Sequence, residues 1–329
     1  MTNMFKGAAA GLAALAFAAL PLAAAQAQDF PNRPVTMVVP FSAGGPTDTV
    51  ARLIAESMSR TLGQQVVVEN VGGAGGTRGA GQVAKATPDG YTVLLHHIGQ
   101  ATSATLYRKL PYNVLTDFEE VGLVTDVPMT VIGKSGLEPK DAAELIAYVK
   151  ANKDAVIYGN AGVGSASHLC GMLFMSALGT QMTTVPYQGT GPAMNDLVGG
   201  QIDLLCDQTT NTTGQIKAGK VKAYGVTTKT PVKSLPDIPT LDSAGLPGFE
   251  VAVWHGMYAP KGTPKAEIDK LNAALVAALQ DPKVISRFAD LGTEPVALER
   301  ATPEVHQKFL EAEVAKWKPV IEQAGVFAD

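Results

Sequence analysis

Short apolar runs, each followed by a glycine-bearing turn and then by a helical pattern, constrain the fold of this sequence most strongly. The first run, Val35 to Pro40, is continuously apolar and rich in β-branched residues, as expected of a strand buried on both faces of a parallel sheet. Over residues 50–62, apolar residues recur at helical spacing, while Arg52, Glu56 and Arg60 lie four apart on another face. This order predicts an α/β protein built on open parallel sheets.

The same alternation continues and then restarts. A strand over 65–71, a helix near 78–85 and a strand over 91–95 complete the first unit. After Asp126 the patterns predict strands over 131–133, 156–158, 184–187, 202–206 and 222–226. They also predict helices over 141–150 and 167–178, and further helices that begin near Pro192 and Thr213. A second sheet is therefore expected.

From Pro264 onward the sequence is mainly helical, with an apolar stripe formed by Ile268, Leu271, Leu275 and Leu279. These helices have no strands of their own, so the chain should cross back near 248–259 and pack them on the first unit. A chain of about 300 residues exceeds what one compact core usually serves. We expect two domains, which comprise residues 28–126 with 255–329 and residues 127–254.

The amino-terminal residues predict export. Lys6 precedes an uncharged run of Ala and Leu over 7–27, which Pro21 interrupts and which ends in the small-x-small pattern Ala25-Gln26-Ala27. We expect residues 1–27 to be a signal peptide, cleaved after Ala27, and the protein to be periplasmic. A membrane anchor is the alternative, but a spanning helix needs about 20 strongly apolar residues.

Charge and cysteine content exclude several classes of protein. The formal net charge is −4 and becomes −5 when Lys6 is removed, and the basic residues are scattered, so nothing favours binding to nucleic acid. The two cysteines, Cys170 and Cys206, are not at the spacing of a zinc site. In an exported protein they form either a disulfide or two separate buried thiols, and the sequence leaves both open.

Five loops are candidate ligand contacts, because ligands of open parallel sheets bind beyond the carboxyl ends of the strands. Glycine lets the backbone approach a ligand, and the free amides at a helix start carry a positive partial charge. Asp48 fits more simply as an acid that complements the dipole of its helix. A capped helix explains each loop alone, but five loops of one type indicate binding. The loops are Phe41 to Asp48, His96 to Gln100, Gly159 to His168, Tyr187 to Pro192 and Asp207 to Thr212.

None of these loops contains Lys or Arg. The charge of an anionic ligand must therefore be met by backbone amides, helix ends, hydroxyl groups and water. A hydrogen bond to a charged group contributes roughly 1.5 to 3 kcal/mol. Four or five of them in a closed cleft would give an affinity of about 1 μM.

Enzyme motifs are missing from the sequence. It contains no GxxxxGK[ST], GxSxG or HExxH motif, and the dinucleotide-like spacing over 79–84 lies inside a predicted helix. The five histidines, His96, His97, His168, His255 and His306, show no metal-ligand spacing beyond the adjacent pair. We expect no enzyme, cofactor or metal site. A serine hydrolase that uses Ser42 or Ser165 is a remote alternative, since neither serine has a motif-defined base.

Several stretches together resemble the Bug family, the extracytoplasmic solute receptors of tripartite tricarboxylate transporters. They are PNRPVTMVVPFSAGGPTDTVARLIAESM, VVVENVGGAGGTRGAGQVAKATPDGYTVLL, VPYQGTGPAMNDLVGGQIDLLCDQ, LPDIPTLDSAGLPGF and WHGMYAPKGTP. The resemblance covers essentially the whole mature chain. It implies a type II periplasmic-binding-protein fold, in which two α/β domains are joined by a two-segment hinge with the ligand cleft between them. It also implies that ligand carboxylates are bound largely by main chain and bridging waters.

The resemblance also implies ligand-contacting residues. In the first domain they are Phe41, Ser42, Ala43, Gly44, Gly45, Thr47 and Asp48, and in the second they are Gly164, Ser165, Ala166, His168, Tyr187, Gly189, Thr190, Asp207 and Gln208. We add His97 as a side-chain donor or aromatic wall. Selectivity is expected at His96–His97 and at Asp207–Gln208, with a leaning towards an aromatic acid or a di-acid.

The function that this resemblance implies is capture of a small carboxylate by hinge closure, followed by delivery to the permease subunits of a membrane transporter. The carboxylate is a di- or tricarboxylate, an aromatic acid or an acidic amino acid. We expect a monomer. A ligand-sensing receptor that feeds a signalling partner is the alternative.

Overall fold

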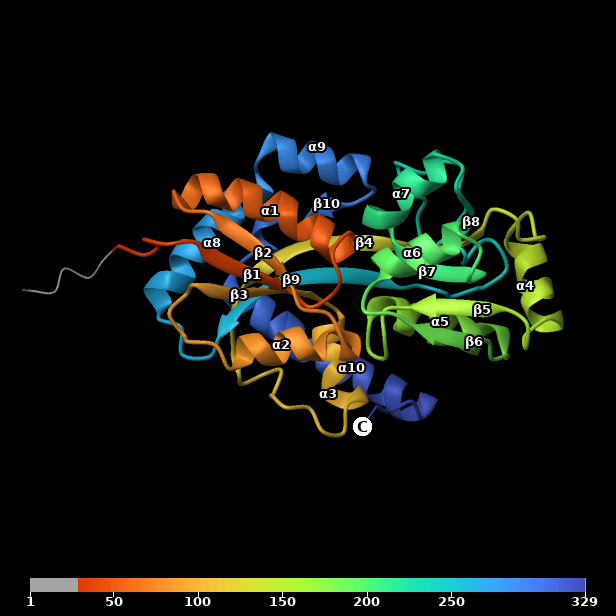
Figure 1. The fold of residues 1–329 in the computed structure, drawn as a ribbon, viewed down its shortest axis with the longest axis horizontal. Coiled ribbons are helices and arrows are strands. Elements are labelled where there is room, and N and C mark those ends of the chain that lie inside the picture. The colour runs from red at the N-terminus through yellow and green to blue at the C-terminus, as the bar shows by residue number, and fades with distance from the viewer. Residues whose placement is uncertain (1–28, 329) are drawn as a thin grey trace, which may run out of the picture.

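The computed structural model describes residues 29–328. The predicted signal peptide, with its cleavage after Ala27, lies outside the described residues. Two lobes of mixed α/β structure lie side by side (Figure 1). The first lobe contains β1–β3, α1–α3 and α8–α10, and the second contains β5–β8 and α4–α7.

The first lobe has the predicted parallel strands. β1 (Val35–Val39) lies between β2 (Val66–Asn70) and β3 (Thr92–His97) and pairs with both in parallel. α1 (Pro46–Leu62) follows β1, with Pro46 in its first turn and Gly63 at φ 66° after its last residue. α2 (Thr77–Ala84) follows the glycine-rich turn that contains the short 3-10 helix η1 (Ala74–Gly76).

The carboxyl-terminal helices cover this first sheet, as the sequence predicts. α8 (Lys265–Leu279) packs on α1 and on the strand β4 (Phe118–Lys134), and α10 (Pro303–Ala324) packs on α3 (Gly99–Leu106) and β4. α9 (Pro282–Asp290) contacts α1 and α8. The stretch is not free of strand: β10 (Glu294–Pro295) pairs with β4, and the 3-10 helix η2 (Leu298–Arg300) follows it.

The second lobe has its own parallel strands. β5 (Ile157–Asn160) pairs in parallel with β6 (Thr183–Pro186) and β7 (Leu204–Gln208), and β8 (Val221–Val226) runs along β4. The helices are α4 (Ala142–Ala151), α5 (Ala166–Leu178), α6 (Thr190–Val198) and α7 (Thr209–Lys217).

The predicted start of α7 near Thr213 is wrong by one turn. The sequence predicts a loop over 207–212, a segment in which threonine, a residue of low helix propensity, is frequent. Tertiary contacts overrule this preference: the hydroxyls of Thr209 and Thr213 donate to the carbonyls of Gly292 and Leu291. The helix therefore begins directly at the end of β7.

The predicted strand over 131–133 is part of a much longer one. β4 spans Phe118–Lys134 and pairs with β9 (Ala252–Pro260) over its first part and with β7 and β8 over its last part. Asp126 and Pro128 interrupt the apolar pattern, which hid this continuity in the sequence. The expected two sheets are therefore joined through β4 into one order, β2-β1-β3-β9-β4-β7-β5-β6.

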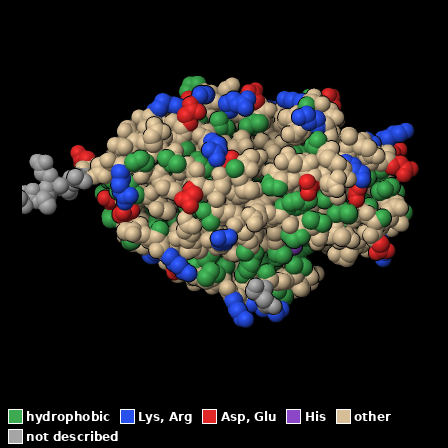
Figure 2. All heavy atoms as spheres, in the orientation of Figure 1, with side chains coloured by type: hydrophobic (Ala, Val, Ile, Leu, Met, Phe, Trp, Pro, Cys, Tyr) green, Lys and Arg blue, Asp and Glu red, His purple; other side chains and the backbone are tan. Residues whose placement is uncertain are grey.

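The surface agrees with the scattered charge of the sequence. Figure 2 shows basic and acidic side chains interspersed over the visible face rather than separated by sign. Across residues 29–328, no helix combines the length and the apolar character that crossing a bilayer requires.

Candidate functional site

A small cavity lies between the two lobes, at the carboxyl ends of β1, β3, β5 and β7. Its volume is about 10 Å³, the space of about one water molecule. This space is too small to hold a dicarboxylate. The cavity is lined by Phe41, Pro46, Thr47 and His97 from the first lobe and by Ala161, Ser165, Ala166, Ser167, Thr190, Asp207 and Gln208 from the second.

Many of the residues expected to contact ligand meet at this cavity. All five predicted loops contribute to it, and the loop that begins at His96 contributes His97 alone. Pro46, Ala161 and Ser167 also line it and were not singled out from the sequence. All three lie inside the predicted loops 41–48 and 159–168. The sequence predicts these loops as ligand contacts but not these three residues. A pattern of glycine and hydroxyl residues does not show which side chains face the cavity.

Two expected contact residues lie at a larger hollow nearby. Ser42 and Tyr187 line a surface hollow of about 730 Å³ where the lobes meet. The amide of Ser42 donates to the carbonyl of Gln188 across the lobes at 3.0 Å, and the Tyr187 hydroxyl donates to Asp196 at 2.7 Å. These residues border the surface hollow and do not line the smaller cavity.

Other expected contacts have structural partners outside the cavity lining. Ala43 and Gly44 are exposed, whereas Gly45 and Gly189 are buried and begin α1 and α6. Gly164, at φ 87°, accepts a hydrogen bond from Thr102 of the first lobe at 3.2 Å. The backbone amide of His168 donates to Ser165, the capping residue of α5, at 3.2 Å.

Asp48 closes its own loop instead of lining the cavity. It accepts hydrogen bonds from the Gly44 amide at 3.0 Å, from Arg52 at 2.9 Å and from Asn70 at 3.0 Å. Burial alone would raise the pKa of Asp48, but the hydrogen bonds from Arg52, Gly44 and Asn70 outweigh it and lower the pKa. Asp48 therefore holds the 41–48 loop in shape and complements the start of α1.

Helix starts supply positive partial charge to the cavity. α1, α6 and α7 all begin there, and their capping residues Gly45, Gly189 and Gln208 form no side-chain cap hydrogen bond. The amides of these first turns are not satisfied within their helices and favour a negative partner. No Lys or Arg of the described chain lines the cavity. An anion there would be held by backbone and hydroxyl groups, as expected from the sequence.

Aromatic rings form the first-lobe side of the site. The ring of His97 stacks on Phe41 with 4.6 Å between centroids, and the ring of His255 lies 6.0 Å from that of His97. Nε2 of His255 is 3.3 Å from the hydroxyl of Thr47, which lines the cavity. His96 is completely buried and does not line the cavity, so His97 is the member of the adjacent pair that lines it.

The hydrogen bonds of His97 fix its tautomer. The Gly99 amide donates to Nδ1 of His97 at 2.9 Å, so Nδ1 is an acceptor and the ring proton is on Nε2. Burial lowers the pKa of His97 to about 3, so the ring is neutral at pH 7. His97, which lines the cavity, therefore carries a neutral N–H donor at Nε2.

Asp207 brings a carboxylate to the second-lobe side. It is 1% exposed and accepts hydrogen bonds from the Thr190 hydroxyl at 2.9 Å and from the Asn211 amide group at 2.6 Å. Burial raises the pKa of Asp207 to about 6, although its hydrogen bonds act in the opposite direction. Within residues 29–328, Asp207 has no ion pair with a basic side chain.

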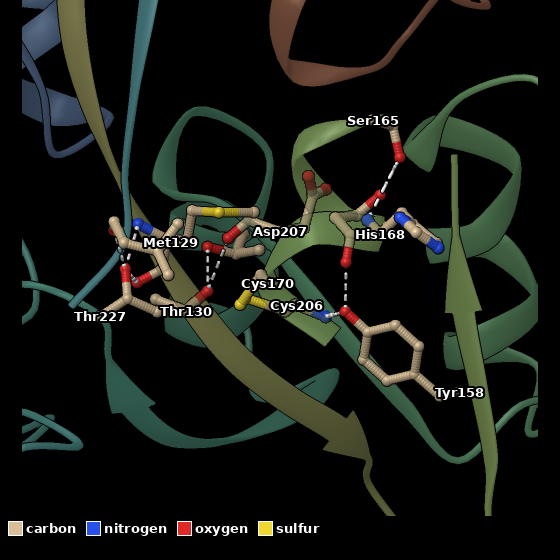
Figure 3. Close-up of a disulfide and its surroundings, with 12 residues drawn as sticks. Met129, Thr130, Tyr158, Ser165, His168, Cys170, Cys206, Asp207 and Thr227 are labelled. Carbon is tan, nitrogen blue, oxygen red and sulfur yellow. Dashed lines mark hydrogen bonds between the residues drawn. A yellow bond between two sulfur atoms is a disulfide. The ribbon is translucent and has the colours of Figure 1, made fainter. Parts of the chain in front are cut away.

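A disulfide supports this side of the cavity. Cys170 of α5 and Cys206 of β7 are bonded, with 6.1 Å between their Cα atoms (Figure 3). The bond links the helix that begins at Ser165 to the strand that carries Asp207. Beside it, the Tyr158 hydroxyl donates to the carbonyl of Ser167 at 2.6 Å. The structure thus favours the disulfide over two separate thiols.

The geometry of a serine hydrolase is not found. The Ser165 hydroxyl contacts the Ser167 hydroxyl at 3.1 Å and the backbone amide of His168, and the buried hydroxyl of Ser42 has no partner. In the described chain, neither hydroxyl is hydrogen-bonded to a histidine ring, which a nucleophile and base require. Within the same residues, no cluster of His, Cys, Asp and Glu could hold a metal ion.

Known proteins resemble this chain along nearly its whole length. The protein from Agrobacterium vitis named "UPF0065 protein in the TAR-I ttuE-ttuC' intergenic region" is 59% identical over 302 residues, which cover 92% of this chain and 87% of that one. The structure of periplasmic binding protein BugD is 55% identical with a TM-score of 0.89, over 91% of this chain and 100% of that one. MatC from Rhodopseudomonas palustris with bound malate is 43% identical with a TM-score of 0.86, over 89% of this chain and 100% of that one.

The family model described as "Tripartite tricarboxylate transporter family receptor" matches residues 50–326, most of the chain. The fold, the interlobe cavity and the likeness to BugD and MatC all agree with this match. The chain therefore belongs to the tripartite tricarboxylate transporter receptor family, also known through its Bug members, and is a periplasmic-type solute-binding protein rather than an enzyme.

Proposed function

We propose that this protein captures a small carboxylate between its lobes by hinge closure and delivers it to the permease subunits of a tripartite transporter. The observation that carries the proposal is the polarity of the cavity: three helix starts without side-chain caps face a small space that no Lys or Arg of the described chain lines. Such a space favours a carboxylate held by amides and hydroxyls. Malate in the MatC structure supports the same class of ligand.

The hinge in this proposal consists of β4 and β9. The predicted domain boundaries fall after residues 126 and 254, and Asp126 and Trp254 are direct partners across these two strands. The first domain is then 28–126 with 255–329, and the second is 127–254. Opening at this paired position would separate the loops of β1 and β3 from those of β5 and β7.

The cellular setting belongs to the same proposal. The protein acts as a monomer in the periplasm after its signal peptide is cleaved behind Ala27. Export to an oxidising compartment agrees with the Cys170–Cys206 disulfide. Mass spectrometry of the secreted protein tests the cleavage site, and a mature chain that begins elsewhere would contradict it.

A thermal-shift screen of purified residues 28–329 tests the ligand class. Di- and tricarboxylates, aromatic acids and acidic amino acids are compared with neutral sugars over a range of concentrations. A ligand of the folded state raises the melting temperature in proportion to the logarithm of its concentration. We expect at least one acid to do so, and a response to sugars alone would overturn the proposal.

Small-angle scattering tests the closure. The cavity of about 10 Å³ cannot admit a dicarboxylate, so the protein must sample a more open shape before it binds. The radius of gyration should fall when a saturating acid is added. Identical scattering curves with and without that acid would exclude hinge closure.

A further inference from the structure

The two sides of the cavity differ in hydrogen-bonding character, and this difference bears on the ligand of the proposed function. The first lobe presents donors, namely the Nε2–H of His97 and the backbone amides at the start of α1. A carboxylate satisfies these groups. The end of β7 and the start of α6 present acceptors, which a plain carboxylate cannot satisfy.

Asp207 is the first acceptor. An ionised carboxylate has about four lone-pair sites. The side chains of Thr190 and Asn211 occupy one site on each oxygen, and the backbone amide of Gln208 adds a further hydrogen bond. Asp207 lines the cavity, is 1% exposed, and has no basic side chain paired with it among residues 29–328. About one lone-pair site of the Asp207 carboxylate therefore remains to accept a hydrogen bond from a ligand in the cavity.

Thr190 and Gln208 extend the same surface. The hydroxyl of Thr190 donates its only proton to Asp207, so towards the cavity its oxygen can only accept. Oε1 of Gln208 is buried with no hydrogen-bond partner in the described chain, and Gln208 is 2% exposed. Both residues line the cavity. Asp207, Thr190 and Gln208 thus form a continuous set of acceptors, here named the acceptor wall.

We propose that the acceptor wall selects carboxylic acids that carry a hydrogen-bond donor, a hydroxyl or an ammonium group, next to a carboxylate, over the same acids without it. The inference rests on the proposed function. The carboxylate faces His97 and the start of α1, while the donor faces Asp207, Thr190 and Gln208. A site built to bind a polar substituent strongly rejects the analogue that lacks it, because its buried polar groups are then unpaired.

Isothermal titration with matched acids tests the selection. The four-carbon set is succinate, malate and aspartate, and the five-carbon set is glutarate, 2-hydroxyglutarate and glutamate. Within a set only the substituent next to one carboxylate differs. We expect the hydroxy or the amino acid to bind at least about ten-fold more tightly than the plain acid in the set that fits. Comparison of the hydroxy acid with the amino acid in the same set also shows whether the site prefers a neutral hydroxyl donor or an ammonium group.

The outcomes separate the two proposals. Equal or tighter binding of a plain acid, or binding confined to aromatic acids without a donor, overturns the selection and leaves carboxylate capture standing. Failure of every acid in both sets and in the wider screen overturns carboxylate capture, and the selection with it.

Variants locate the selection on the wall. In Asp207→Asn the side chain presents an amide donor, so the preference for the substituted acid should fall at least about ten-fold while the plain acid binds as well or better. Asp237→Asn, an exposed change of the same type in the same lobe, is the control and should leave the preference unchanged. An Asp207→Asn protein that weakens all acids by one factor would show a merely structural role. If that variant does not fold, Thr190→Val, which removes one acceptor and keeps the shape, decides the question in the same titrations.

Discussion

At the scale of single residues, His97 illustrates how burial and one hydrogen bond define the donor that a candidate binding residue can present. Its position at the end of β3 is evident from the sequence, but its tautomer depends on the Gly99 amide and its neutrality on complete burial. The stacking on Phe41 then holds the ring in place. Such a group donates to a ligand oxygen without the desolvation penalty of a buried cation.

Replacing His97 tests this role. His97→Phe keeps the stacking on Phe41 and removes the donor, so the affinity for the preferred acid should fall by about ten-fold, as expected for one hydrogen bond to a charged group. His97→Gln retains an amide donor and should lose less. Nitrogen-15 spectra of the histidine rings should show the Nε2-protonated tautomer between pH 5 and 8. A charged ring at pH 7, or equal affinities for the two variants, would contradict the assignment.

The limits of sequence interpretation are also clearest at this scale. The glycine loops that begin α1, α5 and α6 are recognisable because strand and helix periodicities meet there. Whether a side chain in them faces the cavity is not, because it depends on partners far along the chain. Asp48 points to Arg52 and Asn70, whereas Asp207 lines the cavity, and both are acids beside a helix start.

At the scale of elements, the closed form depends on how closely two loops approach. A Cβ atom at Gly189, which begins α6, would overlap the side chain of Ser42 and come within 2.9 Å of its backbone nitrogen. The same two loops share the hydrogen bond from the Ser42 amide to the Gln188 carbonyl. The backbone of Gly189 is extended, so its role is the space it leaves rather than an unusual conformation.

Gly189→Ala should therefore hinder closure without disturbing either lobe. Because apparent affinity falls with the fraction of the closed form, we expect binding of the preferred acid to weaken by about ten-fold. Melting without ligand should change little. Gly214→Ala in α7, where an added Cβ meets nothing, is the matched control. An unchanged affinity of Gly189→Ala would show that the loops need not approach this closely.

The Cys170–Cys206 disulfide also acts between elements, since it fixes α5 to β7. For a sequence separation of 36 residues, the chain-entropy model gives a stabilisation of about 4 kcal/mol. The double variant Cys170→Ala/Cys206→Ala should unfold at correspondingly lower denaturant concentration. Reductant should have no further effect on it. Two alkylatable thiols in the native, unreduced protein would contradict the bond.

Elements with a clean period were predicted well, and those held by distant contacts were not. β1 and α1 follow from their apolar spacing alone. β4 was reduced to its last residues because Asp126 and Pro128 break its pattern, although Asp126 pairs with Trp254 and Pro128 with Ala252. α7 was placed too late because its threonines are held by carbonyls of the first lobe.

At the scale of the whole molecule, buried histidines link stability to pH. Burial lowers the pKa of His97 and His306 to about 3 and places that of His96 and His255 well below the usual value. Between about pH 3 and 6.5, the unfolded chain binds protons that these rings in the folded protein do not. Stability from these groups is thus complete above pH 6.5 and is lost on acidification.

Two buried acids act in the opposite direction. Burial raises the pKa of Glu120 to about 7 and that of Asp207 to about 6, so each contributes stability at low pH that is lost as the pH rises through that range. Each group changes the free energy of unfolding by at most about 1.4 kcal/mol per pH unit. Burial also lowers the pKa of His168, so with five histidines against two acids we expect a net loss of stability from pH 6.5 to about 4.5.

Denaturant unfolding at intervals between pH 7.5 and 4.5 measures this dependence. His306 lies in α10 and does not line the cavity, so His306→Gln should retain ligand binding at pH 7. The variant should also lower the pH dependence of the free energy of unfolding by the contribution of one histidine. A free energy of unfolding that is flat or rises on acidification would refute the expected balance.

The continuous pairing of β4 with β9 through the junction of the lobes has a mechanical consequence. Because these strands and their neighbours share one strand order, the lobes can rotate by a change of twist along the ribbon while its ladder of backbone hydrogen bonds stays intact. None of the backbone hydrogen bonds between β4 and β9 then needs to be broken and remade when the lobes move. We therefore expect the rate of ligand release to be set by dissociation of the ligand and not by refolding of the hinge strands.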